Sequence, residues 1–213
     1  MSIGVLVLDF DGVVIESNDA KTLAFEEVFS RFPEHHEAMM SFHFANISST
    51  RFVKFEHLCA RIGTPNDPKL MSYLAEEFST QMLEKIKVAP LVPGAEAFLR
   101  EYTPRVPVYL ASVTPADELA VILASRGLDH WFRNTYGCPP WTKAGAINDI
   151  LGRERMDPAQ AMLIGDSAGD QEAAEATGVR FVGRESGLKF GDPTPVSFSD
   201  LHEIGRYIDE LIE

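Results

Sequence analysis

An apolar run near the N-terminus, Leu6–Leu8, ends in two carboxylates at Asp9 and Asp11. The side chains of a strand alternate between its faces, so Asp9 and Asp11 point the same way if the chain stays extended. Two carboxylates that lose water on one face repel each other, which is costly unless a cation lies between them or one stays protonated. Because oxygen ligands suit hard divalent cations, a bound metal ion is the simplest resolution.

Four apolar runs predict buried parallel strands, and three of them are continuous, as expected for strands covered on both faces. The runs are Ile3–Leu8, Val106–Ala111, Ala161–Ile164 and Val179–Val182, with Trp131–Tyr136 as a candidate short fifth strand. Helical patterns lie between them at Pro115–Arg126, Ala144–Leu151 and Asp170–Ala176. This alternation predicts an α/β fold with a doubly wound parallel sheet, whose active site lies at the carboxyl ends of the strands.

The strand pattern disappears between about residue 17 and residue 88. Helical patterns occupy this part at Lys21–Arg31, Arg51–Arg61 and Lys69–Lys87, and Ala89–Gly94 is the expected return linker. We therefore expect a core domain formed by residues 1–16 and 89–213, with an inserted helical domain at 17–88. The insertion leaves and re-enters the core beside the carboxylates, where a lid would be hinged.

Composition limits the partners of the 213-residue chain. The net charge is −13, from 19 Lys and Arg against 32 Asp and Glu, which argues against nucleic acid or an anionic membrane as a partner. No apolar run long enough for a membrane span and no signal-peptide pattern is found, and Cys59 and Cys138 are too few for a disulfide framework. We expect a cytoplasmic protein; a monomer is compatible with the sequence, which leaves the oligomeric state open.

Asp9 is the candidate nucleophile, because a carboxylate can attack phosphorus and so divide a difficult hydrolysis into two easier steps. Asp11 is the candidate general acid and base, which would protonate the leaving alcohol and then activate water. Gly12 would let backbone amides approach the phosphoryl oxygens. A surface Asp-Gly turn does not explain the preceding apolar run, and a calcium loop needs its glycine at a different position.

Ser112 ends the second predicted strand, and its hydroxyl, with the amide of Val113, could bind a phosphoryl oxygen. The alternative is that Ser112 only caps the following helix, but Thr114 is better placed for that capping role. Lys143 lies where a helix is expected to begin, a poor place for a cation unless it binds carboxylate and phosphoryl groups. An ordinary solvated lysine is the alternative.

Asp166 and Asp170 follow the third buried run and are candidate ligands of Mg²⁺, Asp170 either directly or through water. The alternative is that both acids only cap the helix that begins near Asp170. An ordered series of carboxylate pair, hydroxyl, lysine and carboxylate pair therefore extends along the chain, and three of these four sites end a predicted strand.

This order resembles the four motifs of the haloacid dehalogenase-like superfamily over essentially the whole chain. The matching residues are Asp9 and Asp11, Ser112, Lys143, and Asp166 with Asp170. The resemblance implies a Rossmann-like core, an aspartyl-phosphate intermediate and Mg²⁺ dependence. It also implies metal contacts from the carboxylates of Asp9 and Asp166 and from the backbone carbonyl of Asp11. The helical insertion is similar to the cap of the subgroup that includes phosphoglycolate phosphatase and β-phosphoglucomutase.

The stretch Ser41–Lys54 is polar and locally basic, and it is the candidate surface for substrate selection. Arg51 or Lys54 could hold a carboxylate or second anionic group of the substrate. The favoured alternative is a loop that leads into an amphipathic helix with Arg51 and Lys54 on its solvated face. Phenylalanines of this region are expected in the core of the insertion, namely Phe42, Phe44, Phe52 and Phe55.

The sequence thus predicts a Mg²⁺-dependent phosphatase of a small phosphorylated metabolite. Two alternatives remain. A phosphomutase would use the same core but return the phosphoryl group to a sugar. A non-catalytic protein would bind a phosphorylated ligand without hydrolysing it, although the intact carboxylates disfavour this reading.

Overall fold

The computed structural model describes residues 2–47 and 49–212. The chain divides into two compact units. The core unit is Met1–Glu16 together with Pro90–Glu213, and the helical unit is Ser17–Ala89. Among the described residues, no helix is both long enough and apolar enough to cross a membrane.

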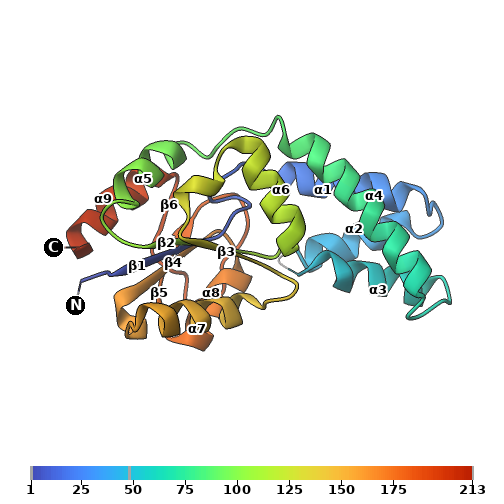
Figure 1. The fold of residues 1–213 in the computed structure, drawn as a ribbon. Helices are drawn as coiled ribbons and strands as arrows, with labels where there is room; N and C mark the ends of the chain where they lie inside the picture. The colour runs from blue at the N-terminus through green and yellow to red at the C-terminus, as the bar shows by residue number, and fades with distance from the viewer. Residues whose placement is uncertain (1, 48, 213) are drawn as a thin grey trace. The chain divides into compact units, whose positions relative to one another are not determined.

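The core unit is built on a six-stranded parallel sheet with the order β3-β2-β1-β4-β5-β6 (Figure 1). The strands are β1 (Val5–Leu8), β2 (Val108–Ser112), β3 (Asn134–Gly137), β4 (Ala161–Gly165), β5 (Arg180–Arg184) and β6 (Ser197–Phe198). Val7 of β1 pairs with Tyr109 of β2 on one side and with Leu163 of β4 on the other. The predicted α/β class, with a doubly wound parallel sheet, is confirmed.

Helices cover both faces of this sheet. They are α5 (Ala95–Tyr102), α6 (Ala116–Arg126), α7 (Lys143–Glu154), α8 (Ala168–Thr177) and α9 (Leu201–Ile212), with short 3₁₀ turns at Asp129–Trp131 and Pro158–Gln160. In Figure 1, α7 and α8 lie below the sheet, and α5 and α9 lie above it. The sheet is therefore the middle layer of three.

Burial on both faces explains the continuous apolar runs. Val5 and Val7 of β1 belong to one core cluster with Ile147 of α7 and Ala174 of α8. Leu6, which alternates with them, is also fully buried. Every position of β1 is therefore apolar, as strands of a covered parallel sheet require.

Several boundaries differ from the predicted ones. The third strand begins at Asn134 rather than Trp131, because Asp129–Trp131 form a 3₁₀ turn. Strand β6 and helices α5 and α9 were not predicted; β6, at two residues, is too short to show a pattern.

The helical unit contains α1 (Asn18–Ser30), α2 (His36–Ala45), α3 (Arg51–Arg61) and α4 (Pro68–Ile86). Asp67 caps α4 by accepting hydrogen bonds from the amides of Lys69 and Leu70, and Pro68 occupies the first turn. Helix α2 was not predicted, and it includes the start of the stretch Ser41–Lys54, where the favoured alternative placed a loop that leads into the helix at Arg51. Ser48 of that stretch lies outside the described residues.

Aromatic side chains form the core of the helical unit. The ring centroids of Phe25 and Phe78 lie 4.3 Å apart, and Phe55 lies 6.1 Å from each of them. Phe55 is buried as expected. Phe44, in contrast, is 59% exposed, so its predicted place in this core is wrong. Helix α2 turns Phe44 outward and its neighbour His43 inward.

Candidate active site

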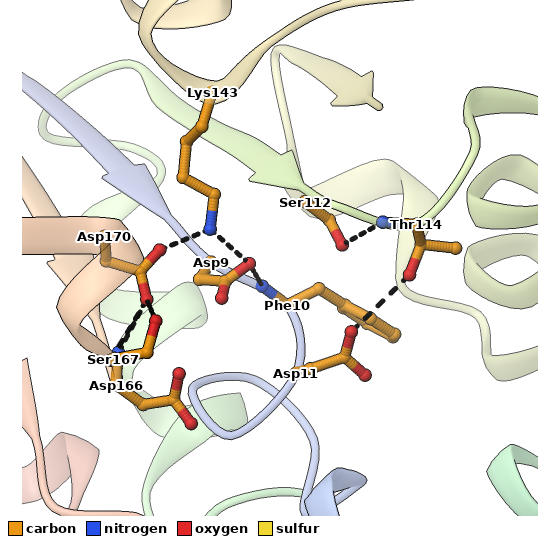
Figure 2. Close-up of polar contacts among 9 residues, drawn as sticks. All are labelled: Asp9, Phe10, Asp11, Ser112, Thr114, Lys143, Asp166, Ser167 and Asp170. Carbon is orange, nitrogen blue, oxygen red and sulfur yellow. Dashed lines mark hydrogen bonds and ion pairs between the residues drawn. The ribbon is translucent and has the colours of Figure 1, made fainter. Parts of the chain in front are cut away.

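The candidate site lies where three neighbouring strands end (Figure 2). Asp9 follows β1, Ser112 is the last residue of β2, and Asp166 follows β4. The amide of Asp9 still donates to the carbonyl of Ile164 at 2.9 Å, so the sheet ladder holds this backbone in place. Sequence positions far apart thus meet at one edge of the sheet, as the parallel topology requires.

Asp9 is buried and faces a cation. Its Oδ1 accepts a hydrogen bond from the amide of Phe10 at 2.7 Å and lies 3.0 Å from Nζ of Lys143. Burial raises the pKa of the Asp9 carboxyl well above its usual value, and the charges of Asp170, Asp166 and Asp11 raise it further, while Lys143 opposes them. An ionised Asp9 therefore depends on positive charge close to it.

Lys143 is the first residue of α7 and forms ion pairs with both Asp9 and Asp170. Burial by itself would lower the pKa of the ammonium group, but the carboxylates of Asp170 and Asp9 outweigh it and raise this pKa above its ordinary value. These partners explain a cation at the positive end of a helix. Thr142 caps the helix by accepting a hydrogen bond from the amide of Gly145 at 3.0 Å.

Asp170 caps the start of α8, which is one of the two roles that the sequence left open, and it is also a charge partner of Lys143, which the sequence analysis did not predict. Its Oδ2 accepts hydrogen bonds from the amides of Asp166 and Ser167, both at 3.1 Å, and from the hydroxyl of Ser167 at 2.7 Å. Its Oδ1 faces Lys143. A Cβ at Gly165 would overlap the side chain of Asp170, so the close approach requires glycine there.

Three buried carboxylates in the described residues lie close enough together that they could hold a metal ion. Ligand oxygens of Asp9, Asp166 and Asp170 all lie within 4.8 Å of one another. The chemistry of the set, all oxygen and all carboxylate, is the kind that Mg²⁺ prefers. The side chain of Asp11 is not part of this group.

Asp11 points elsewhere because the chain turns directly after Asp9. The amides of Val14 and Ile15 donate to the carbonyl of Phe10 at 3.0 and 3.1 Å, and Gly12 has a φ of +73°. The chain does not stay extended through position 11, so the strand alternation that would place both carboxylates on one face does not apply. Figure 2 shows the Asp11 carboxylate directed toward Thr114, whose Oγ1 lies 3.5 Å from Oδ2 of Asp11.

Ser112 and Thr114 are both buried at the end of β2. The hydroxyl oxygen of Ser112 accepts a hydrogen bond from the amide of Thr114 at 3.1 Å. The predicted capping role of Thr114 is wrong, because α6 has Pro115 at its N-cap and no side-chain hydrogen bond there. Thr114 faces Asp11 instead, which makes it a site residue that the sequence analysis missed. Its spacing of two residues from Ser112 was the available signal.

Arg51 and Lys54 lie in the helical unit, and the expectation that they occupy a solvated face is wrong. Arg51 is 8% exposed and Lys54 is fully buried. The guanidinium of Arg51 donates to the hydroxyl of Ser79 at 2.8 Å, and its central carbon lies 4.5 Å from the ring centroid of Phe78.

Lys54 is held by backbone carbonyls. Its Nζ donates to the carbonyls of Ile47 and Ser49 at 3.3 and 3.1 Å and lies 4.7 Å from the ring centroid of Phe25. Burial, with a smaller contribution from Lys21, lowers the pKa of Lys54 to about 7. Aromatic faces and carbonyl acceptors compensate part of the cost of burying both cations.

The fold and the carboxylate–lysine site together define an α/β enzyme core. The family model for haloacid dehalogenase-like hydrolases matches residues 6–184. The chain therefore belongs to the haloacid dehalogenase-like hydrolase family, and the predicted enzyme class, a hydrolase of this phosphatase-rich type, is confirmed.

Relatives agree with this assignment over the full length. The phosphoglycolate phosphatase of Vibrio cholerae is 24% identical over 224 residues, which span 99% of this chain and 98% of the relative. A haloacid dehalogenase-like hydrolase from Bacteroides fragilis shares the fold with a TM-score of 0.77 at 20% identity, covering 95% of this chain and 99% of its own. A hydrolase of the same family from Bacillus subtilis, solved bound to magnesium, has a TM-score of 0.70 at 16% identity. The match covers 98% of this chain and 100% of the Bacillus subtilis chain.

Proposed function

We propose that this protein is a Mg²⁺-dependent phosphatase that hydrolyses a small phosphorylated metabolite through an aspartyl-phosphate on Asp9. The observation that carries the proposal is a buried carboxylate, Asp9, in an ion pair with Lys143 and close to Asp166 and Asp170. A phosphatase among the full-length relatives supports the same chemistry.

The donor set fits a magnesium ion held by Asp9 and Asp166, with the backbone carbonyl of Asp11 as a further proposed ligand and Asp170 close by. When bound, Mg²⁺ would supply positive charge that favours ionised Asp9 and neutralises charge on the transferring phosphoryl group. The magnesium-bound relative supports this proposal.

In the first step, an oxygen of Asp9 attacks phosphorus, and Asp11 gives its proton to the leaving alkoxide oxygen. In the second step, Asp11 takes a proton from the water that attacks phosphorus. Inorganic phosphate leaves and Asp9 is regenerated as a carboxylate. Lys143, the hydroxyl of Ser112 and the amide of Val113 stabilise charge on the phosphoryl oxygens, and Gly12 allows the backbone to approach them.

The helical unit would act as the cap. Its two connections to the core unit start side by side, because the amide of Glu16 donates to the carbonyl of Pro90 at 2.9 Å. Adjacent connections are what a hinged insertion needs. We keep Arg51 as the proposed contact for a second anionic group of the substrate. Lys54 is proposed to support binding through the backbone of Ile47 and Ser49 that it holds.

The test is phosphate release from a panel of phosphorylated metabolites and an aryl phosphate, with Mg²⁺ and with EDTA. We expect release that requires metal and is lost in Asp9→Asn. Arg51→Ala should weaken hydrolysis of the best metabolite more than that of the aryl phosphate. Isomerisation of a sugar phosphate that needs a bisphosphate primer, without phosphate release, would instead identify a mutase. Metal-dependent binding of a phosphate analogue without turnover would identify a non-catalytic protein.

We propose the cytoplasm as the location of the protein, since Cys59 and Cys138 are both free thiols.

A further inference from the structure

Arg184, the last residue of β5, is a buried cation that none of the proposed chemical steps uses. It is only 6% exposed. Its guanidinium pairs with Glu16 through both terminal nitrogens, with one of the two contacts at 3.0 Å. The same group donates to the carbonyl of Gly12 at 3.2 Å and, through Nε, to the carbonyl of Ser199 at 3.2 Å.

These contacts hold both ends of one short turn. Gly12 is the residue directly after Asp11, and Glu16 is the last residue of the core unit before the helical unit begins. Within the turn, the amide of Gly12 donates to the carbonyl of Ile15 at 2.8 Å. Arg184 thus connects the end of β5, which is paired with β4 in the sheet, to the segment that carries Asp11.

The presence of arginine rather than lysine at position 184 also indicates a role in holding the neighbouring backbone in place. A buried guanidinium is costly and is tolerated only where its partners are well placed. The planar fork of arginine can bind a carboxylate with two nitrogens and still direct a donor to a carbonyl, which the single ammonium of lysine cannot reproduce. Displacing a reacting group by about 1 Å can slow an enzyme by on the order of 100-fold.

We propose that Arg184 is a positioning residue for proton transfer: by binding Gly12 and Glu16, it fixes the turn that holds Asp11 within reach of the leaving oxygen. This inference rests on the proposed role of Asp11 as general acid.

The test compares two leaving groups. An alkyl phosphate such as β-glycerophosphate needs a proton on its leaving oxygen, whereas dinitrophenyl phosphate has a leaving group stable enough to depart without one. We would measure kcat/KM for both substrates in the wild type and in Arg184→Met, Arg184→Lys and Glu16→Gln. Asp11→Asn serves as the reference for a lost acid. Arg153→Gln, which removes an exposed arginine paired with Asp149, serves as the control.

Loss of positioning predicts a selective effect. Arg184→Met should lower kcat/KM for the alkyl phosphate by about 10-fold or more and for the activated aryl phosphate by less than about 3-fold, following the direction of Asp11→Asn. Arg184→Lys and Glu16→Gln should show the same selectivity with smaller losses, and Arg153→Gln should match the wild type. If Arg184→Met does not fold, the two milder variants decide the question.

Equal losses on both substrates, or no loss on the alkyl phosphate, would overturn the inference, because a purely structural role lowers the amount of folded enzyme without regard to the leaving group. Asp11→Asn separates this failure from a failure of the proposed function. If Asp11→Asn itself shows no selectivity for leaving group, the assignment of Asp11 as the acid is wrong. If it does and the Arg184 variants do not, only the role of Arg184 is wrong.

Discussion

Replacing Lys54 by methionine should remove a pH-dependent part of the stability of the helical unit. The pKa of this buried amine is lowered from its ordinary value of 10.5 to about 7, mainly because burial disfavours the charged form. The unfolded chain restores the ordinary value, so between these two pH values it binds a proton that the folded chain has released. The free energy of unfolding therefore rises with pH in this range, by up to about 1.4 kcal/mol per pH unit.

The range from about pH 7 to about pH 8.5 isolates this contribution. Burial raises the pKa values of the Cys59 and Cys138 thiols from their ordinary value of 9.0, so these groups weaken the fold mainly above this range. The pKa of His43 is lowered to about 4, so it titrates below the range. Because Lys54 of the folded chain is half protonated at pH 7, it should raise the free energy of unfolding by roughly 1.5 kcal/mol between pH 7 and pH 8.5.

The assay is amide hydrogen exchange of peptides from α1–α4 in the full-length protein, corrected for the intrinsic exchange rate at each pH. In the wild type, the opening free energy should increase by roughly 1.5 kcal/mol, and in Lys54→Met it should stay level. Lys69→Met, a matched change at an exposed lysine of α4, should behave as the wild type. A rise in Lys54→Met parallel to the wild type would refute the reasoning, because the amine would then be fully charged inside the unit.

Three further changes test the site and its surroundings. Gly165→Ala should abolish most phosphate release because the new Cβ would overlap Asp170, whereas Gly152→Ala, with nothing within 4 Å, should keep activity and stabilise α7 by about 0.5–1 kcal/mol in thermal unfolding. Asp170→Asn keeps one acceptor oxygen for the Ser167 contacts but removes the charge opposite Lys143, so kcat should fall by about 10-fold or more. An unchanged kcat would contradict the role of this ion pair, and Asp149→Asn, at a partly buried aspartate of α7 that pairs with Arg153, is the control. His43→Leu should reduce the loss of stability in acid. The pKa of His43 is lowered from 6.5 to about 4, so the unfolded chain binds an extra proton as pH falls through this range. The wild type should therefore lose up to about 3 kcal/mol of its free energy of unfolding, which the variant should keep. Identical acid titrations of unfolding for both proteins would count against this.

Much of the sheet could be predicted from the sequence because its central strands are continuous apolar runs. Leu6–Leu8 and Ala161–Ile164 are continuous apolar runs, and an acid follows each run within two residues. A parallel sheet brings such strand ends together whatever the loops do. The convergence of Asp9 and Asp166 at one edge follows from that rule, and Lys143 joins them from the start of α7, the helix that follows β3.

Other features depend on contacts that no local pattern records. Asp11 turns toward Thr114 because the chain folds back onto the carbonyl of Phe10. The burial of Lys54 depends on the ring of Phe25 and on backbone carbonyls, which overrides the usual preference of lysine for solvent. Arg184 reaches Glu16 across 168 residues of sequence, so its partner is visible only in three dimensions.

The central claim is that Asp9 becomes phosphorylated, and direct detection of that adduct tests it best. Asp11→Asn, which should slow hydrolysis of the intermediate, would be mixed with dinitrophenyl phosphate, whose leaving group needs no proton, and Mg²⁺, then quenched in acid and digested for mass spectrometry. We expect the mass of one added phosphoryl group on Asp9. This adduct should be labile to hydroxylamine and absent from the double variant that also carries Asp9→Asn. A phosphoryl group on another residue, or steady phosphate release with no adduct at any time, would contradict the account.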